Sequence, residues 1–104
     1  LNSSNQWVLT DANAVATSIG LLAVAMGSSV SDGMCIRGMA SLKTTFPGSP
    51  VNGDVLYLDG VTPGAATGTA PAGNGDVVRV LGYKISSGER MWFNPDNTFV
   101  EVTA

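Results

Sequence analysis

The chain has 104 residues, of which 44% are hydrophobic and 12% are charged, and its net charge is -3. This size supports one domain with a single modest core, and the apolar content excludes a disordered chain. The five basic residues are scattered and form no stripe that could follow a phosphate backbone, so we expect no nucleic-acid binding. The longest apolar run, Leu21 to Met26, is far shorter than the roughly 20 residues of a transmembrane helix, so we expect no membrane insertion.

The residue types leave little room for catalysis. The chain has one cysteine, Cys35, and no histidine, which excludes an internal disulfide and removes the commonest general base and metal ligand. The carboxylates remain as acid-base candidates, but most lie beside Gly or Asn in predicted turns, where Asp bonds the turn backbone. We therefore expect no enzyme activity and no cofactor. We assign no metal site, and a structural metal held by the turn oxygens stays an open alternative without support of its own. The carboxylates are Asp11, Asp32, Asp54, Asp59, Asp76, Glu89, Asp96 and Glu101.

The first quarter of the chain carries mixed signals. Leu1 to Leu9 predicts the end of one strand, a turn and a second short strand over residues 6–9, and its abrupt start suggests a fragment that lacks an N-terminal part. Asp11 to Ser18 predicts a loop or a short helical turn, because a nearby glycine and several β-branched residues oppose a longer helix. Leu21 to Met26 predicts a buried strand, and a single helix across residues 11–26 is the alternative.

Turn residues then separate short apolar runs. Ser28 to Gly33 ends in Asp-Gly and predicts a hairpin turn. Met34 to Arg37 is the expected return strand, and Met39 to Thr45 continues as another strand. Phe46 to Pro50 is the clearest breaker of the chain and divides it into two halves.

The sequence Asn-Gly-Asp-Val occurs twice, at Asn52 to Val55 and at Asn74 to Val77. Each copy predicts a tight turn that enters an apolar strand. We expect one strand at Val55–Leu58 and a long buried strand at Val77–Ile85, the central strand of the second half. Residues 61–74 between them are rich in Gly, Ala, Thr and Pro and have little tendency to form a helix.

Two further strands complete the chain, at Arg90–Phe93 and at Thr98–Val102, with turns at Ser86–Gly88 and at Asn94–Asn97. Together these elements predict one all-β domain over residues 1–104, with the architecture of a small antiparallel β-sandwich or barrel. Apolar residues recur at a similar spacing in the two halves, which suggests two pseudo-symmetric half-units.

Aromatic side chains are the remaining candidates for contacts. Trp7 is expected to anchor the core or an interface. Adjacent residues of a strand face opposite sides, so one of Trp92 and Phe93 faces the core and the other meets solvent, a partner chain or a ligand. We predict interface or ligand contacts at Trp7, Tyr83, Trp92 and Phe93, since exposed aromatic rings are also suited to stacking on sugars.

Five motifs carry a resemblance to a known class of protein. They are Leu21 to Gly27, Asp32 to Gly38, Gly53 to Leu58, Gly75 to Tyr83 and Trp92 to Glu101. Taken together, the chain resembles a β domain of bacteriophage virion proteins and is similar to sequences in phage tail-fibre and other structural proteins. It has a looser similarity to the small capsid cement or decoration proteins, which share the Gly-Asp-Val-Leu-Tyr-Leu strand opening.

The resemblance implies a structural or adhesive role on the virion surface, and it brings no catalytic residue with it. It also implies assembly in copies, commonly threefold, so we expect a homo-oligomer, specifically a trimer, that contacts other virion proteins. Host attachment would add a host surface glycan as a partner. A carbohydrate-binding module is the alternative function, and a small hydrolase with paired carboxylates ranks last.

Overall fold

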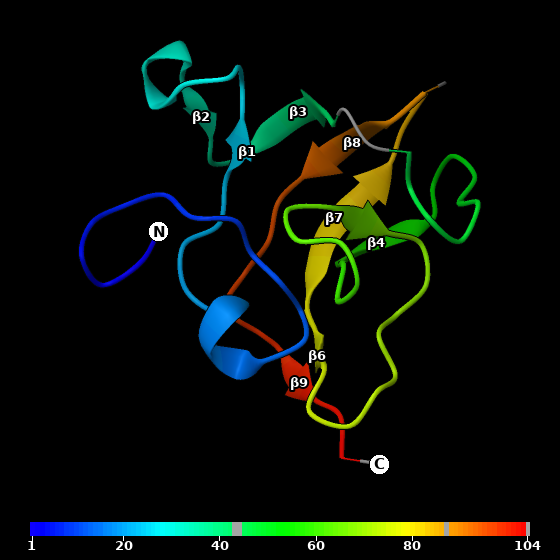
Figure 1. Ribbon diagram of the computed structural model, residues 1–104. Helices are drawn as coiled ribbons and strands as arrows, with labels where there is room; N and C mark the ends of the chain where they lie inside the picture. Colours follow the sequence, from blue (N-terminus) through cyan, green and yellow to red (C-terminus); the bar gives the residue numbers. More distant parts are fainter. Residues whose placement is uncertain (43–44, 87, 104) are drawn as a thin grey trace.

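The computed structural model describes residues 1–42, 45–86 and 88–103, and within them the chain is nearly all β (Figure 1). All strand pairs are antiparallel, as predicted. Two short 3-10 turns, η1 (Val15–Thr17) and η2 (Val30–Asp32), are the helical elements of the described chain. The strands are β1 (Val24–Ala25), β2 (Met34–Cys35), β3 (Gly38–Ser41), β4 (Val55–Leu58), β5 (Ala66–Thr67), β6 (Val77–Val78), β7 (Val80–Lys84), β8 (Arg90–Phe93) and β9 (Val100–Glu101).

The main sheet has five strands in the order β3-β8-β7-β4-β5, and β1-β2 and β6-β9 form two small sheets beside it. β7 is the middle strand of the five, which confirms the predicted central strand of the second half. The predicted strand Val77–Ile85 is nevertheless two strands, because Arg79 interrupts it and separates β6 from β7.

Three turns are built in the same way around an aspartate at their fourth position. In residues 51–54 and 73–76, the Asp N–H donates to the carbonyl of the first residue, whose own N–H donates to the Asp carboxylate. Residues 29–32 repeat this arrangement in η2. The third residue of the first two turns, Gly53 or Gly75, has a positive φ of 93° or 84°, which glycine accepts without strain. The repeated Asn-Gly-Asp-Val sequence therefore forms tight turns, as predicted.

The N-terminal residues 1–10 form a loop, and the predicted strand over residues 6–9 is wrong. Ala12 instead pairs with the second half of the chain, because its N–H donates to the carbonyl of Asp59 and its carbonyl accepts from the N–H of Val77. Ala12 is fully buried, and its small side chain lets the N-terminal segment pass between the ends of β4 and β6.

The predicted buried strand Leu21–Met26 is present only as β1. Its side chains alternate from Leu21 to Ala25, with Leu22 and Val24 buried and Leu21 and Ala25 exposed, so one face of this segment remains open. The alternative helix across residues 11–26 is wrong, because η1 is a single short turn.

The boundaries of the other strands agree with the predicted ranges to different degrees. β4 and β8 match the predicted ranges, whereas β2, β3 and β9 are shorter than predicted. Lys43, Thr44 and Ser87, which the sequence places in a strand and a turn, lie outside the described residues. β5 was not predicted, because its Ala-Thr sequence has no strand signal of its own and forms through pairing with β4.

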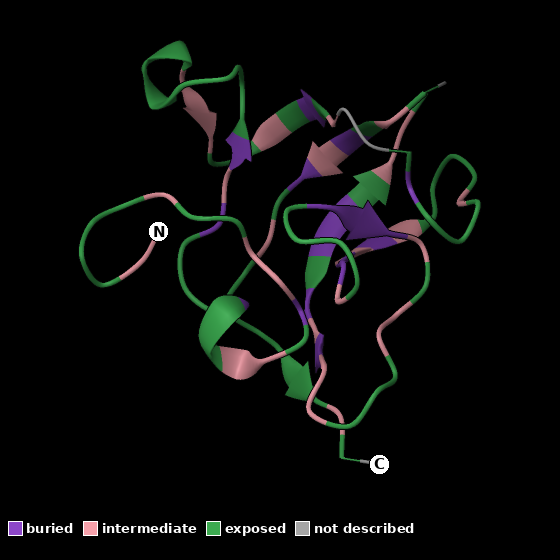
Figure 2. Ribbon diagram, viewed as in Figure 1, coloured by how far each residue is buried: buried purple, intermediate pink, exposed green. Residues whose placement is uncertain are grey.

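One face of the five-stranded sheet is covered by the N-terminal third of the chain, which gives the fold two layers, as in a small β-sandwich. Figure 2 shows buried residues concentrated on the sheet and exposed residues over the N-terminal loop and the β1-β2 turn. The second layer is mostly irregular chain. The core residues are Ala12, Leu22, Val24, Ala40, Phe46, Leu56, Leu58, Ala66, Leu81, Met91 and Phe93.

The two halves of the chain are alike only in one hairpin each. β1-β2 and β7-β8 are both antiparallel hairpins, but β1-β2 stands alone, whereas β7-β8 lies inside the five-stranded sheet. Strand β3 of the first half pairs with β8 of the second, which joins the halves edge to edge. The pseudo-symmetric pattern in the sequence therefore does not extend to the sheet topology.

Arg79 is a buried charge at the junction of β6 and β7, and it is 3% exposed. Its guanidinium donates to two backbone carbonyls, that of Ser18 (2.9 Å) and, twice, that of Asp96 (2.7 and 3.1 Å). Burial lowers the pKa of Arg79, and the carboxylate of Asp96 opposes that shift. Arginine stays protonated in proteins. The side chain therefore ties η1 to the loop after β8 as a charged clamp.

Candidate functional site

The outer face of the five-stranded sheet is shaped by a β-bulge between β4 and β7. Leu56 is opposite Gly82 and Tyr57 is opposite Val80, so Leu81 is an extra residue on β7. The extra residue lets Leu81 and Gly82 both face the core and leaves Val80 and Tyr83 on the outer face. A side chain at Gly82 would collide with the carbonyl oxygen of Trp92, so the close approach of β8 at this point requires glycine.

Directly opposed residues of neighbouring strands share a face of the sheet. On the outer face, Met39 of β3 is opposite Trp92 of β8, Trp92 is opposite Tyr83 of β7, and Tyr83 is opposite Val55 of β4. We call Met39, Trp92, Tyr83 and Val55 the outer row. Strands lie about 4.8 Å apart, so the outer row spans about 14 Å across the sheet.

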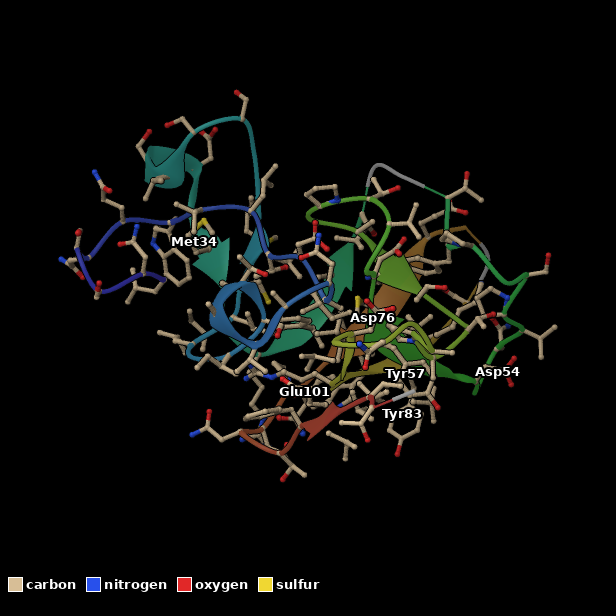
Figure 3. All side chains as sticks on the ribbon, turned by 60° about the horizontal axis from the view of Figure 1, so that its bottom comes forward. Met34, Asp54, Tyr57, Asp76, Tyr83 and Glu101 are labelled. Atoms are coloured by element: carbon tan, nitrogen blue, oxygen red, sulfur yellow. The ribbon has the colours of Figure 1, made fainter. Side chains whose placement is uncertain are left out.

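The outer row is apolar and largely uncovered. Met39 is 55% exposed and Tyr83 is 49% exposed, while Trp92 and Val55 are half-buried. Tyr57 follows Val55 by two residues and is opposite Val80, so it lies beside the row on the same face, and Figure 3 labels it together with Tyr83. The sheet therefore presents two tyrosines and a tryptophan on one flat surface.

Polar side chains flank the outer row at the end of β8. Ser41 is opposite Arg90, and both residues are exposed. They lie two residues along from Met39 and Trp92 and therefore share the outer face. A guanidinium and a hydroxyl thus lie on the same face near the tryptophan, whereas the polar groups of the row itself are the tyrosine hydroxyl and the indole N–H of the tryptophan.

The structure brings two of the four predicted contact residues together. Tyr83 and Trp92 are directly opposed on the outer face. Trp92 and Phe93 face opposite sides, as predicted, but Phe93 is 2% exposed and belongs to the core. The prediction that Phe93 contacts a partner or ligand is therefore wrong. Met39 and Val55 were missed, because only strand register shows that they join the aromatic pair.

Trp7 lies apart from the outer row, in the N-terminal loop. It is half-buried and helps to line an apolar groove of about 610 Å³ between the N-terminal loop, the β1-β2 hairpin and the core face of the sheet. Leu9, Leu21 and Met26 line the same groove and are exposed. The molecule therefore has a second uncovered apolar surface.

The aspartates are occupied with turn geometry. Each of the six accepts a hydrogen bond from a backbone N–H two residues ahead or three residues behind, at 2.8 to 3.2 Å. Asp59 alone also has a buried carboxylate oxygen without a partner among the described residues, and nothing in the structure explains it. Among those residues no group of three His, Cys, Asp or Glu side chains is placed to hold a metal ion.

The described residues also contain no helix with the length and hydrophobicity needed to cross a bilayer. Comparisons of the chain with protein-family models, curated proteins and solved structures found no significant match. The candidate site therefore consists of the outer row and its polar flank, defined by the geometry of the sheet alone.

Proposed function

We propose that this chain is a structural domain of a bacteriophage virion surface, in a tail fibre or a capsid decoration protein, and that it acts by packing against other chains. The observation that carries the proposal is the uncovered outer row. An apolar surface that crosses four strands with no charged side chain is typical of surfaces that another chain covers.

Three further features support a packing role over an enzymatic one. The chain has few charges for its size. The groove beside Trp7 is a second apolar surface, and its burial by another chain would stabilise an assembly. The aspartates already bond turn backbones, which leaves no evident pair for acid-base chemistry. The virion itself enters the proposal through the sequence resemblance.

Self-assembly is tested by the mass of the purified chain, measured by sedimentation equilibrium over a wide range of concentration. We expect an oligomer that dissociates on dilution and is weakened at least tenfold in Tyr83→Ser, since burying a tyrosine contributes more than about 1.4 kcal/mol. Val61→Ser is the matched control, because Val61 is 89% exposed, lies in the loop after β4 and is not part of the outer row. A wild-type chain that is monomeric at all concentrations would contradict the proposal.

The virion location needs a separate experiment. Cryo-electron microscopy of intact particles that encode this chain should reveal ordered copies on the fibre or the capsid. Particles in which neither carries density for the domain would reject the virion role and leave the self-assembly result intact.

A carbohydrate-binding module is the second candidate, and the pairing of Tyr83 with Trp92 favours it. Two adjacent aromatic rings with Arg90 and Ser41 beside them combine a stacking surface with hydrogen-bonding groups. Titration with bacterial surface polysaccharides, followed by tryptophan fluorescence, should then show saturable binding that Tyr83→Ala abolishes and Val61→Ala leaves unchanged. Unchanged fluorescence with every polysaccharide would exclude this candidate.

A further inference from the structure

The two edges of the five-stranded sheet differ in their protection. At the β5 edge, the N–H of Gly68 donates to the carbonyl of Pro47 (2.9 Å), and the hydroxyl of Thr67 donates to the same carbonyl (3.3 Å). Pro50 packs against Gly68, where an added Cβ would lie 2.9 Å from the proline ring. A proline-containing loop thus covers this edge, which is a usual protection against strand addition.

The β3 edge lacks such cover in the described part of the chain. The β3-β8 ladder continues at Leu42, whose N–H donates to the carbonyl of Glu89 (2.9 Å). Hydrogen-bonded residues alternate along an antiparallel strand, so Ala40 also bonds to β8, whereas Met39 and Ser41 direct their N–H and C=O groups away from the sheet. Among the described residues, none of these four groups has a hydrogen-bond partner.

The β3 edge is also suited to pairing by its residue types. The strand Gly-Met-Ala-Ser contains no proline and no charge, and it has no bulge against β8. Prolines, charged side chains and bulges are the features that normally protect an exposed edge from pairing, and β3 has none of them. Met39 belongs to both surfaces, since its backbone faces the free edge and its side chain begins the outer row.

We infer that a second copy of this chain pairs with this one through β3, antiparallel and about a twofold axis centred on Met39. The inference rests on the proposed self-assembly and adds the β3 edge to it as a second contact, beside the outer row. Because the β5 edge is covered, β3 of one copy has no β5 edge to join, and the self-complementary pairing of β3 with β3 closes as a dimer. Strand addition of this kind supplies main-chain hydrogen bonds, with side chains setting the register.

The register follows from the outer row. With the axis at Met39, Met39 of one copy is opposite Met39 of the other. The two outer rows then join into one apolar band that crosses both sheets. With the axis at Ala40, Met39 would be opposite Ser41, which would break the band. The centred register also places Arg37, exposed before β3, opposite Ser41 of the second copy, away from its own equivalent.

Ser41→Pro tests the edge separately from the outer row. The substitution removes the N–H of residue 41, which has no hydrogen-bond partner among the described residues of a single copy, and it keeps every side chain of the outer row. We expect the wild-type chain to have the mass of an even number of copies, two where only the β3 edge is paired, and the variant to form this pair at least about tenfold more weakly, since two intermolecular hydrogen bonds are lost per pair. Circular dichroism checks that the variant folds.

Cross-linking tests the register even if Ser41→Pro does not fold. In a Cys35→Ser background, Met39→Cys should form a disulfide-linked dimer on mild oxidation, because an axis at this residue brings its two copies within disulfide range. Ser41→Cys and the loop control Val61→Cys should cross-link far less. Equal cross-linking at all three positions would overturn the inference.

The mass of the assembly in solution, together with the two variants, shows separately whether the β3 contact or the proposed function fails. A trimer, or a dimer that is unaffected by Ser41→Pro and does not cross-link at Met39→Cys, overturns the β3 contact and leaves self-assembly standing. A monomer at every concentration overturns both.

Discussion

The two faces of the five-stranded sheet are built from alternate residues of the same strands, yet they have opposite environments. Trp92 and Phe93 are adjacent in β8; Phe93 lies in the core, and Trp92 lies half-exposed in the outer row. The N-terminal third of the chain covers the inner face, whereas Met39 and Tyr83 on the outer face are exposed. Similar apolar residues thus stabilise the fold on one face and are available for contacts on the other.

Hydrophobicity alone therefore does not identify a core residue in this protein. β7 contains Leu81 in the core and Val80 and Tyr83 on the outer face, and the bulge decides which residue faces which way. Substitutions on the two faces should therefore separate stability from association.

The largest effect is expected from Phe93→Ala on the inner face, which should lower the free energy of unfolding by about 3–5 kcal/mol because it leaves a cavity in the core. Trp92→Ala should cost less than about 2 kcal/mol, since part of the ring is already in water. Urea unfolding of each variant measures both values. Equal losses would mean that the outer face is as tightly packed as the core.

An intermediate effect is expected from Arg79→Met, whose apolar side chain would leave the carbonyls of Ser18 and Asp96 without their donor. Hydrogen bonds to a charged group contribute about 1.5–3 kcal/mol each, and buried acceptors left unpaired add a desolvation cost, so we expect a loss of about 3 kcal/mol. Arg90→Met is the matched control on the outer face and should stay within about 0.5 kcal/mol. Thermal unfolding at low protein concentration compares the two, and similar melting temperatures would refute the clamp.

The smallest effect is expected from Tyr83→Ser, which should change the unfolding free energy of the dissociated chain by no more than about 1 kcal/mol, because half of the ring is exposed. The same substitution is expected to weaken association strongly. Chemical unfolding at high dilution isolates the monomer. A loss as large as that of Phe93→Ala would assign the outer row to folding and remove its main support as an interface.

Local signals predicted the parts of the fold that depend on local chemistry. The Asn-Gly-Asp-Val turns, β4 and β8 were predicted well, because a glycine with positive φ and an aspartate that bonds its own turn act within a few residues. The opposite facing of Trp92 and Phe93 also followed from strand geometry alone.

The elements that the sequence did not predict correctly depend on pairing between distant parts of the chain. β5 has no strand signal and exists because β4 offers it a partner, and the strand expected over residues 6–9 is replaced by the bonds of Ala12 to the ends of β4 and β6. Of the candidate site, the sequence indicated Tyr83 and Trp92, whereas Met39 and Val55 joined them only through register.

The sequence alone is enough to predict a small all-β domain of low charge, with its Asn-Gly-Asp-Val turns and the strands β4 and β8 at the positions that local residue chemistry favours. Only the folded chain fixes which face of each strand is covered and where the bulge falls. Only there, among the described residues, does a proline-containing loop close one edge of the sheet while β3 stays open. The physical reason is that turns and alternation act between neighbouring residues, whereas cover, register and edges depend on residues that meet only after the chain has folded.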